Sequence, residues 1–130
     1  MTILGIGTDL VDLTRFEGVL TRHEGRFEKR IFDPSELAMA DKRRYRVAFL
    51  GARFAAKEAV AKALGTGFGQ GVEASQIIIT GGGGAPCGAT LIGAASDRAK
   101  ALGVTRVWVS ISHTDHHASA TAVLEGRVGS

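Results

Sequence analysis

The sequence predicts an α+β fold in which one long central helix packs on antiparallel strands. The N-terminal half carries apolar residues at helical spacing, and its longest helical stretch covers about residues 41–64. In the C-terminal half, apolar and polar residues alternate between glycine-rich turns, as they do in antiparallel hairpins. Helices that precede hairpins in this way are typical of α+β proteins. A length of 130 residues matches one domain, so residues 1–130 are expected to form a single unit.

The N-terminal half is expected to contain a short strand and four helical segments. The strand covers residues 2–7, and an amphipathic helix follows over about residues 12–21. A short helical piece is expected over residues 26–31. The next helix starts at Asp33-Pro34-Ser35-Glu36, because Asp can cap a helix and proline is tolerated in its first turn. The longest helix, residues 41–64, ends before Gly65 and presents on one face Val47, Leu50, Phe54, Ala61 and Leu64.

The C-terminal half is expected to form two hairpins separated by a helix. Strands over residues 76–80 and 87–92 are joined by the glycine-rich segment 81–86. A helix over about residues 94–102 leads to a second hairpin of residues 106–112 and 117–124. Its first strand places Val107, Val109 and Ile111 on one face, and Trp108 on the other.

Composition favours a cytoplasmic protein without a membrane span. Hydrophobic residues make up 45% of the chain and charged residues 22%, and no apolar run approaches the roughly 20 residues that a span needs. The first residues lack the basic, apolar and small-residue regions of a secretory signal. The single cysteine, Cys87, cannot form an intrachain disulfide and is expected to be a packed thiol.

The net charge of +3 is unevenly distributed along the chain. Residues 15–62 hold twelve of the sixteen basic residues but only seven of the thirteen acidic ones, a local excess of five positive charges. This half should attract an anionic partner. Aromatic residues make up only 6% and do not alternate with the basic ones, so the pattern does not favour single-stranded nucleic acid. An acidic protein or a phosphorylated small molecule fits at least as well.

Asp9 is the first candidate for chemistry, because it follows the predicted N-terminal strand. The glycines of Gly5-Ile6-Gly7 are not a dinucleotide fingerprint, since Leu10 stands where a third glycine would be needed. They allow the strand end to turn sharply and leave Asp9 at a rim where it could bind a cation. The alternative is that Asp9 only caps the next helix.

Glu58 is the second candidate carboxylate, on the long helix. Glu58 and Lys62 stand four residues apart, which alone indicates an exposed ion pair worth a few tenths of a kcal/mol. Arg53 and Lys57 are near Glu58 in the sequence as well. One carboxylate among these two cationic side chains and Lys62 suits a site for a metal ion and a pyrophosphate. Magnesium typically uses one or two protein carboxylates with phosphate oxygens and water, and Asp9 and Glu58 would supply that pair.

The C-terminal hairpin supplies histidines. His113, His116 and His117 invite a zinc hypothesis, but a tight turn cannot easily bring three imidazoles onto one ion and a fourth ligand is missing. His113 directly follows a strand and is better interpreted as a phosphate donor or a proton relay, or as a solvated turn residue. The run 81–84 lacks the lysine and helix of a P-loop and is interpreted as a hairpin tip.

Taken together, three motifs closely resemble the holo-acyl-carrier-protein synthases, the short bacterial class of 4′-phosphopantetheinyl transferases. They stand in the family's order and spacing, and the resemblance covers essentially the whole chain. The motifs are Gly5-Ile6-Gly7-Thr8-Asp9-Leu10-Val11 with Arg15, Arg53-Phe54-Ala55-Ala56-Lys57-Glu58-Ala59 with Lys62-Ala63, and Val109-Ser110-Ile111-Ser112-His113-Thr114.

The resemblance implies the 4′-phosphopantetheinyl transferase fold and a magnesium-dependent enzyme. It would move phosphopantetheine from coenzyme A to a serine of apo acyl carrier protein and release adenosine 3′,5′-bisphosphate. Asp9 and Glu58 become the expected magnesium ligands, with Lys62 as a third catalytic residue that donates to the phosphates. For the base that takes the serine proton, Glu58 and a water on the metal are both candidates.

The resemblance also implies a coenzyme A site and an oligomer. The family is typically a homotrimer with sites at its subunit interfaces, and a basic residue of segment 42–46 contributes to the nucleotide pocket. Similar enzymes carry a basic residue just before Pro86, where this chain has Ala85, so a phosphate contact from that loop is in doubt. The residues expected to bind coenzyme A are Arg53, Lys62, Gly65, Pro86, His113 and Thr114.

The partner implied by the resemblance is an apo acyl carrier protein, a strongly acidic molecule. Arg15, Arg22 and Arg26 match the family's basic docking surface and agree with the charge asymmetry. Two other functions remain open from the residues alone. A non-catalytic anion-binding module would explain the basic residues but not Asp9 and Glu58, and a metal-dependent nucleotide phosphatase would turn over without a protein acceptor.

Overall fold

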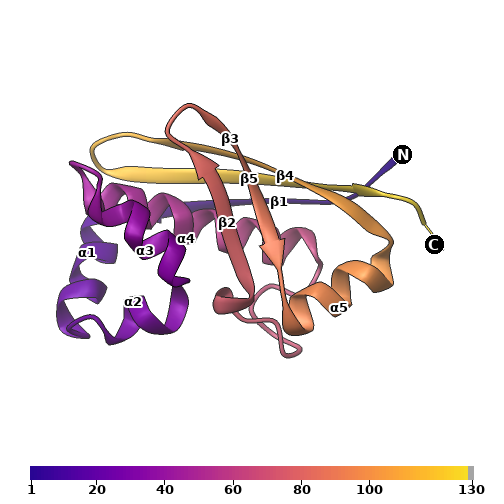
Figure 1. Ribbon diagram of the computed structural model, residues 1–130, viewed down its shortest axis with the longest axis horizontal. Coiled ribbons are helices and arrows are strands. Elements are labelled where there is room, and N and C mark those ends of the chain that lie inside the picture. The colour runs from indigo at the N-terminus through magenta and orange to yellow at the C-terminus, as the bar shows by residue number, and fades with distance from the viewer. Residues whose placement is uncertain (129–130) are drawn as a thin grey trace.

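The computed structural model describes residues 1–128, which form an antiparallel sheet, five α-helices and a short 3-10 helix. The strand order across the sheet is β1-β5-β4-β3-β2. Helix α4 lies along the sheet, while α1, α2 and α3 gather at one end of the molecule and α5 at the other (Figure 1). The elements in chain order are β1 (Thr2–Asp12), α1 (Leu13–Arg22), α2 (Arg26–Ile31), α3 (Pro34–Asp41), α4 (Arg46–Ala63), η1 (Ala74–Gln76), β2 (Ile77–Gly82), β3 (Ala85–Leu91), α5 (Gly93–Leu102), β4 (Val104–His113) and β5 (His117–Gly126).

The expected α+β order is confirmed, but two predicted boundaries were wrong. Strand β1 does not end at Gly7, because its residues pair with β5 as far as Asp12 opposite His117. Helix α4 begins at Arg46 rather than near residue 41, because α3 runs to Asp41 and Lys42 caps its C-terminal end. The helix start at Asp33 is confirmed by a capping box that Asp33 forms with Glu36.

The correction to β1 changes the position of Asp9. Asp9 lies within the strand, opposite Ala120 of β5, and not in a turn after it. Helix α1 is capped by Asp12, whose side chain accepts a hydrogen bond from the Arg15 backbone N–H at 3.0 Å. The alternative role of Asp9 as a helix cap is therefore excluded.

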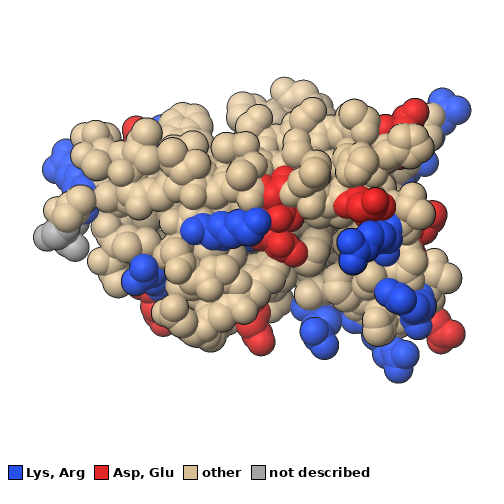
Figure 2. Space-filling model, turned by 180° about the vertical axis from the view of Figure 1, so that it is seen from behind, with Lys and Arg blue, Asp and Glu red and all other residues tan. Residues whose placement is uncertain are grey.

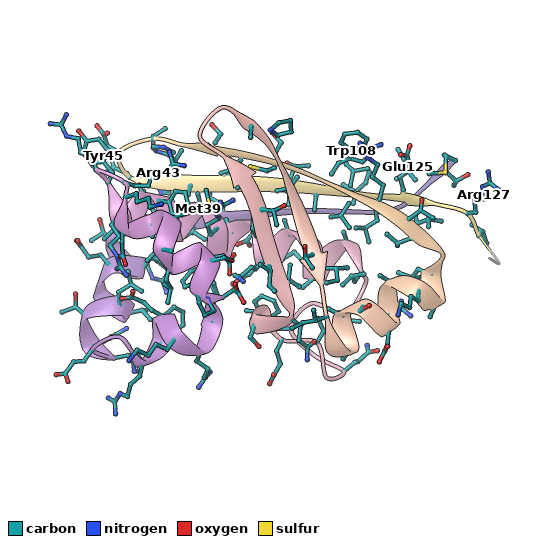
Figure 3. The ribbon with its side chains drawn as sticks, in the orientation of Figure 1. Met39, Arg43, Tyr45, Trp108, Glu125 and Arg127 are labelled. Atoms are coloured by element: carbon teal, nitrogen blue, oxygen red, sulfur yellow. The ribbon has the colours of Figure 1, made fainter. Side chains whose placement is uncertain are left out.

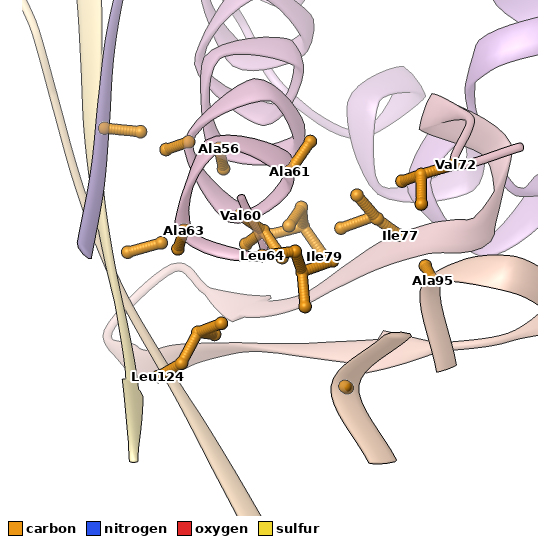
Figure 4. Close-up of a cluster of buried hydrophobic side chains, with 14 of the residues drawn as sticks. Ala56, Val60, Ala61, Ala63, Leu64, Val72, Ile77, Ile79, Ala95 and Leu124 are labelled. Carbon is orange, nitrogen blue, oxygen red and sulfur yellow. The ribbon is translucent and has the colours of Figure 1, made fainter. Parts of the chain in front are cut away.

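The main hydrophobic core lies between α4, the sheet and α5. Val60 and Leu64 of α4 are buried and belong to one cluster with Ile77 and Ile79 of β2 and Leu124 of β5 (Figure 4). Burying these side chains contributes roughly 1.5–3 kcal/mol each. The helix is thereby held between two parts of the same sheet.

A buried ion pair joins α4 to α3 and β2. Lys57 Nζ lies 2.8 Å from Glu36 Oε1, and both side chains are fully buried. Lys57 also donates to the carbonyl oxygens of Ala74 and Ile77, and Glu36 accepts from the backbone N–H of Ile79. Burial lowers the pKa of Lys57, and the Glu36 carboxylate offsets part of that shift. The prediction that Lys57 would join Glu58 at a phosphate site was wrong, because Lys57 points into the core.

Within residues 1–128, no helix packs on the outer face of the sheet. The paired registers align Ile6 with Val123 and Trp108, and they align Leu10 with Ser119 and a serine of β4. Ile6, Leu10 and Trp108 are exposed, so this face presents large apolar side chains to solvent. Among the described residues, no helix has both the length and the apolar character needed to cross a membrane.

Candidate active site

Two glycines determine how closely α4 approaches β1. A Cβ atom on Gly7 would overlap the carbonyl oxygen of Ala59, and one on Gly5 would overlap the carbonyl oxygen of Ala63. Ala59 and Ala63 are themselves small and buried, so the helix backbone packs directly on the strand. Each step of two residues along β1 moves back one turn along α4. Asp9 is the next residue on this face of the strand. It therefore lies beside α4, next to the side chains of Glu58 and Lys62.

Asp9, Glu58 and Lys62 meet at this contact, as predicted. Lys62 Nζ donates to Asp9 Oδ1 at 2.9 Å and to the Thr8 carbonyl oxygen at 3.1 Å. The Lys62 side chain is 50% exposed and that of Asp9 only 12%. The expected i,i+4 ion pair between Glu58 and Lys62 is replaced by a pair between Lys62 and Asp9, because β1 brings Asp9 within reach.

Burial and the neighbouring Asp9 perturb the Glu58 carboxyl group. Burial raises the pKa of Glu58, the negative charge of Asp9 raises it further, and Lys62 opposes both effects. The hydrogen bond to Asp9 raises the pKa of Lys62. One ammonium group thus faces two neighbouring carboxylates, which leaves a surplus of negative charge that a divalent cation would neutralise.

The donor set of this pair suits magnesium better than zinc. Two carboxylates supply the hard oxygen ligands that magnesium prefers, with room for water and phosphate oxygens in the remaining positions. No group of three or more His, Cys, Asp or Glu side chains that could hold a metal occurs within residues 1–128. The zinc hypothesis for the histidine turn therefore gains no support.

The carboxylates border an open groove of about 300 Å³ between β1, α1 and α4. Arg15 lies on the α1 side of this groove, and Phe54, one turn before Glu58, lines it from α4. Arg15, Arg22 and Arg26 are all exposed on α1 and α2. Basic side chains gather at the end of the molecule that carries these helices, at the right of Figure 2. A negatively charged partner could approach the carboxylate site from that end.

Arg53 and His113 line a different hollow. This cavity of about 340 Å³ lies between the α3–α4 connection, the β2–β3 hairpin and β4. Arg53 is almost fully buried there, and its Nη2 donates to the Gly81 carbonyl oxygen at 2.6 Å. The resemblance implied a basic residue of segment 42–46 at the nucleotide pocket without choosing one, and both Arg43 and Arg44 of that segment line this cavity. Sequence reasoning gave no binding role to three further lining residues, Tyr45, Phe49 and Cys87.

The remaining predicted site residues lie elsewhere. Gly65 follows α4 with φ +84, and Arg98 Nε donates to the preceding Leu64 carbonyl oxygen at 2.9 Å. Thr114 Oγ1 accepts hydrogen bonds from the backbone N–H groups of His116 and His117, which stabilises the β4–β5 turn. Pro86 lies in β3 and is not among the residues that line the Arg53 cavity.

Comparison with known proteins identifies relatives over nearly the whole chain. A family model described as the 4′-phosphopantetheinyl transferase superfamily matches residues 5–123. The holo-[acyl-carrier-protein] synthase of Shewanella amazonensis is 45% identical over 125 residues, which cover 95% of this chain and 99% of the relative. A crystal structure of the Neisseria meningitidis holo-[acyl-carrier-protein] synthase matches with a TM-score of 0.86 and 35% identity, over 95% of this chain and 99% of that one. The Helicobacter pylori synthase, solved in complex with coenzyme A, matches with a TM-score of 0.80 and 28% identity, over 92% of this chain and 99% of that one.

Replacing Gly7 with alanine tests whether the helix–strand contact builds the site. We expect Gly7→Ala to lower the free energy of unfolding by about 1–3 kcal/mol, because its methyl group must displace the Ala59 carbonyl. Urea denaturation measures this loss. Gly18→Ala is the matched control: nothing lies within 4 Å of its added Cβ, and helix α1 should gain about 0.5–1 kcal/mol. Equal effects of the two substitutions would contradict the close-contact account.

Proposed function

The chain belongs to the 4′-phosphopantetheinyl transferase superfamily, and from its site geometry we propose how it transfers the 4′-phosphopantetheine group of coenzyme A to a serine of apo acyl carrier protein. The products are holo acyl carrier protein and adenosine 3′,5′-bisphosphate. The observation that carries the proposal is the contact of Asp9 with Glu58 and Lys62 across β1 and α4. This places two carboxylates and one ammonium group at the rim of an open groove.

Asp9 and Glu58 are the proposed magnesium ligands. Bound there, Mg²⁺ would neutralise the negative charge that develops on the leaving phosphate of the pyrophosphate. Lys62 is half exposed and already oriented by Asp9 and the Thr8 carbonyl oxygen, so its remaining N–H bond can point at a phosphate oxygen. This orientation is set before substrate binds, which reduces the cost of organising the site.

Glu58 is the proposed acceptor of the serine proton. Burial and the nearby Asp9 raise the pKa of Glu58 when no metal is bound, and a bound Mg²⁺ would lower it again, so the proposal rests on the position of the carboxylate and not on this shift. The groove between α1 and α4 leaves this carboxylate open to a serine presented by the carrier protein. We place the carrier on Arg15, Arg22 and Arg26, whose charges should speed association and lose effect with added salt.

The nucleotide end of coenzyme A requires more than one subunit in this proposal. Asp9 and Glu58 line one hollow of the chain, with Lys62 bound to Asp9 beside it, whereas Arg53 and His113 line another. We propose a homotrimer in which the Arg53 hollow of one subunit faces the Asp9 groove of the next. The exposed apolar face of the sheet, with Ile6, Leu10 and Trp108, supplies a surface for this association. A cytoplasmic location agrees with the composition.

Replacing Glu58 with glutamine separates the enzyme from a binding module. Glu58→Gln keeps the side-chain shape but removes the charge needed for both metal and proton, so transfer should fall by roughly 100-fold or more. Intact-mass spectrometry of apo acyl carrier protein, incubated with coenzyme A and Mg²⁺, measures the rate. Asp97→Asn, which removes an exposed charge on α5, is the control and should leave the rate unchanged.

Other outcomes of this experiment point to the alternative functions. A binding module would transfer nothing in the wild type and would bind its anionic partner as well or better after Glu58→Gln. A nucleotide phosphatase would release product from coenzyme A at the same rate without a carrier protein. Either result, in a protein shown to be folded by circular dichroism, would contradict the transferase.

The oligomer is tested by placing a charge on the open sheet face. Ile6 is 63% exposed, so Ile6→Lys should leave the fold of one chain intact. Sedimentation velocity should show wild type at three times the mass of one chain and Ile6→Lys at the mass of one chain. Ile92→Lys, at an exposed residue outside this face, should remain trimeric. A monomeric wild type with full transfer activity would refute the shared site.

A further inference from the structure

The only cysteine of the chain borders the Arg53 cavity. Cys87 lies in β3, opposite Val109 of β4, and is half-buried rather than fully packed as its sequence context suggested. Its neighbours around the 340 Å³ hollow include three arginines, namely Arg43, Arg44 and Arg53. Reactive cysteines occupy electropositive and partly exposed surroundings of this kind, whereas structural cysteines are buried among apolar groups.

Arg53 has unused hydrogen-bonding capacity at this position. Arg53 is only 2% exposed, and its Nη2 donates to the Gly81 carbonyl oxygen and to Met39 Sδ. Its Cζ lies 4.7 Å from the centre of the Phe49 ring. Its Nε has no hydrogen-bond partner within residues 1–128, although buried polar groups are nearly always paired. Burial lowers the pKa of Arg53, and the sulfur of Cys87 is near enough to oppose that shift. The unpaired Nε–H of this buried guanidinium, beside a thiol, indicates a place for a negatively charged ligand.

Arg43 and Arg44 extend the positive charge to the mouth of the cavity. Both are exposed, and the Arg43 guanidinium lies 5.1 Å from the centre of the same Phe49 ring. Figure 3 shows Arg43 near Tyr45 and Met39, at the end of the molecule where the α3–α4 connection meets the β4–β5 turn. Three guanidinium groups around one cavity raise the local concentration of small anions.

We propose that Cys87 is a site of reversible thiol modification by an anionic low-molecular-weight disulfide, for which glutathione disulfide is the representative. The Cys87 thiolate attacks one sulfur of the disulfide, so that a new S–S bond forms while the original one breaks. The other half leaves as a thiolate and takes up the proton that Cys87 released. The disulfide is the oxidant, and a dithiol reverses the reaction.

The modification would also act as a switch on the enzyme, and this part rests on the proposed function. A glutathionyl group on Cys87 would fill the hollow and place its carboxylates on the arginines. Arg53 and His113 would then be closed to coenzyme A. Modified protein should therefore bind coenzyme A at least tenfold more weakly, and dithiothreitol should restore the affinity.

The first test compares a charged and an uncharged disulfide. Reduced protein is incubated with glutathione disulfide or with 2-hydroxyethyl disulfide, and the adduct is followed by intact-mass spectrometry. Each rate is divided by the rate of a free model thiol with the same reagent. We expect this normalised rate to be at least tenfold higher for glutathione disulfide than for 2-hydroxyethyl disulfide. Arg43→Gln and Arg44→Gln, both at exposed residues, should reduce that preference, while Arg127→Gln, at the exposed residue just after β5, should not.

The outcomes distinguish the modification from the transferase. Cys87→Ser must form no adduct, because the chain has no other cysteine. No adduct on folded wild type, or equal rates for the two reagents, would overturn the site whatever the transfer activity of the reduced protein. A modified protein that binds coenzyme A as tightly as the reduced one would overturn the switch. Reduced protein that transfers nothing would refute the proposed function and leave the mass measurement valid.

Discussion

The contact of α4 with β1 is the constraint on which the rest of the site depends. Gly5 and Gly7 allow the helix backbone to lie directly on the strand, and Ala59 and Ala63 keep the helix surface flat enough to do so. Asp9 therefore reaches Lys62, from a strand more than fifty residues away in sequence. Larger side chains in this interface would move the helix outward and separate the two carboxylates.

A second interaction fixes the opposite side of the same helix. Lys57 points into the core, where it pairs with Glu36, while the next residue, Glu58, points towards the groove. Successive residues of a helix are about 100° apart, so one turn can serve the core and the site at once. Removing one partner of a buried pair leaves an uncompensated charge and costs about 3–5 kcal/mol. The pair thus fixes the helix that carries Glu58, although its own charges never meet the substrate.

The sequence predicted the order of helices and strands well, but it predicted the orientation of individual side chains less well. The order of elements and the cap at Asp33 followed from local signals. The end of β1 did not, because its extension depends on pairing with β5, more than a hundred residues later. Lys57 was misplaced because helical spacing alone does not show which charged residue finds a buried partner. The proximity of Asp9 and Glu58 is confirmed, while their role as metal ligands stays a prediction. The position of Cys87 at a cavity could be found only once β3 and α4 were placed together.

The proposed mechanism requires that Asp9 and Glu58 hold a divalent cation against the pyrophosphate of coenzyme A. Crystals grown with coenzyme A and Mn²⁺ in place of Mg²⁺ would locate the metal by its anomalous scattering. We expect an anomalous peak bound by both carboxylates and by phosphate oxygens, and we expect this peak to be absent from a Glu58→Gln crystal. A peak on other side chains, or coenzyme A bound with no metal between it and Asp9, would contradict this mechanism.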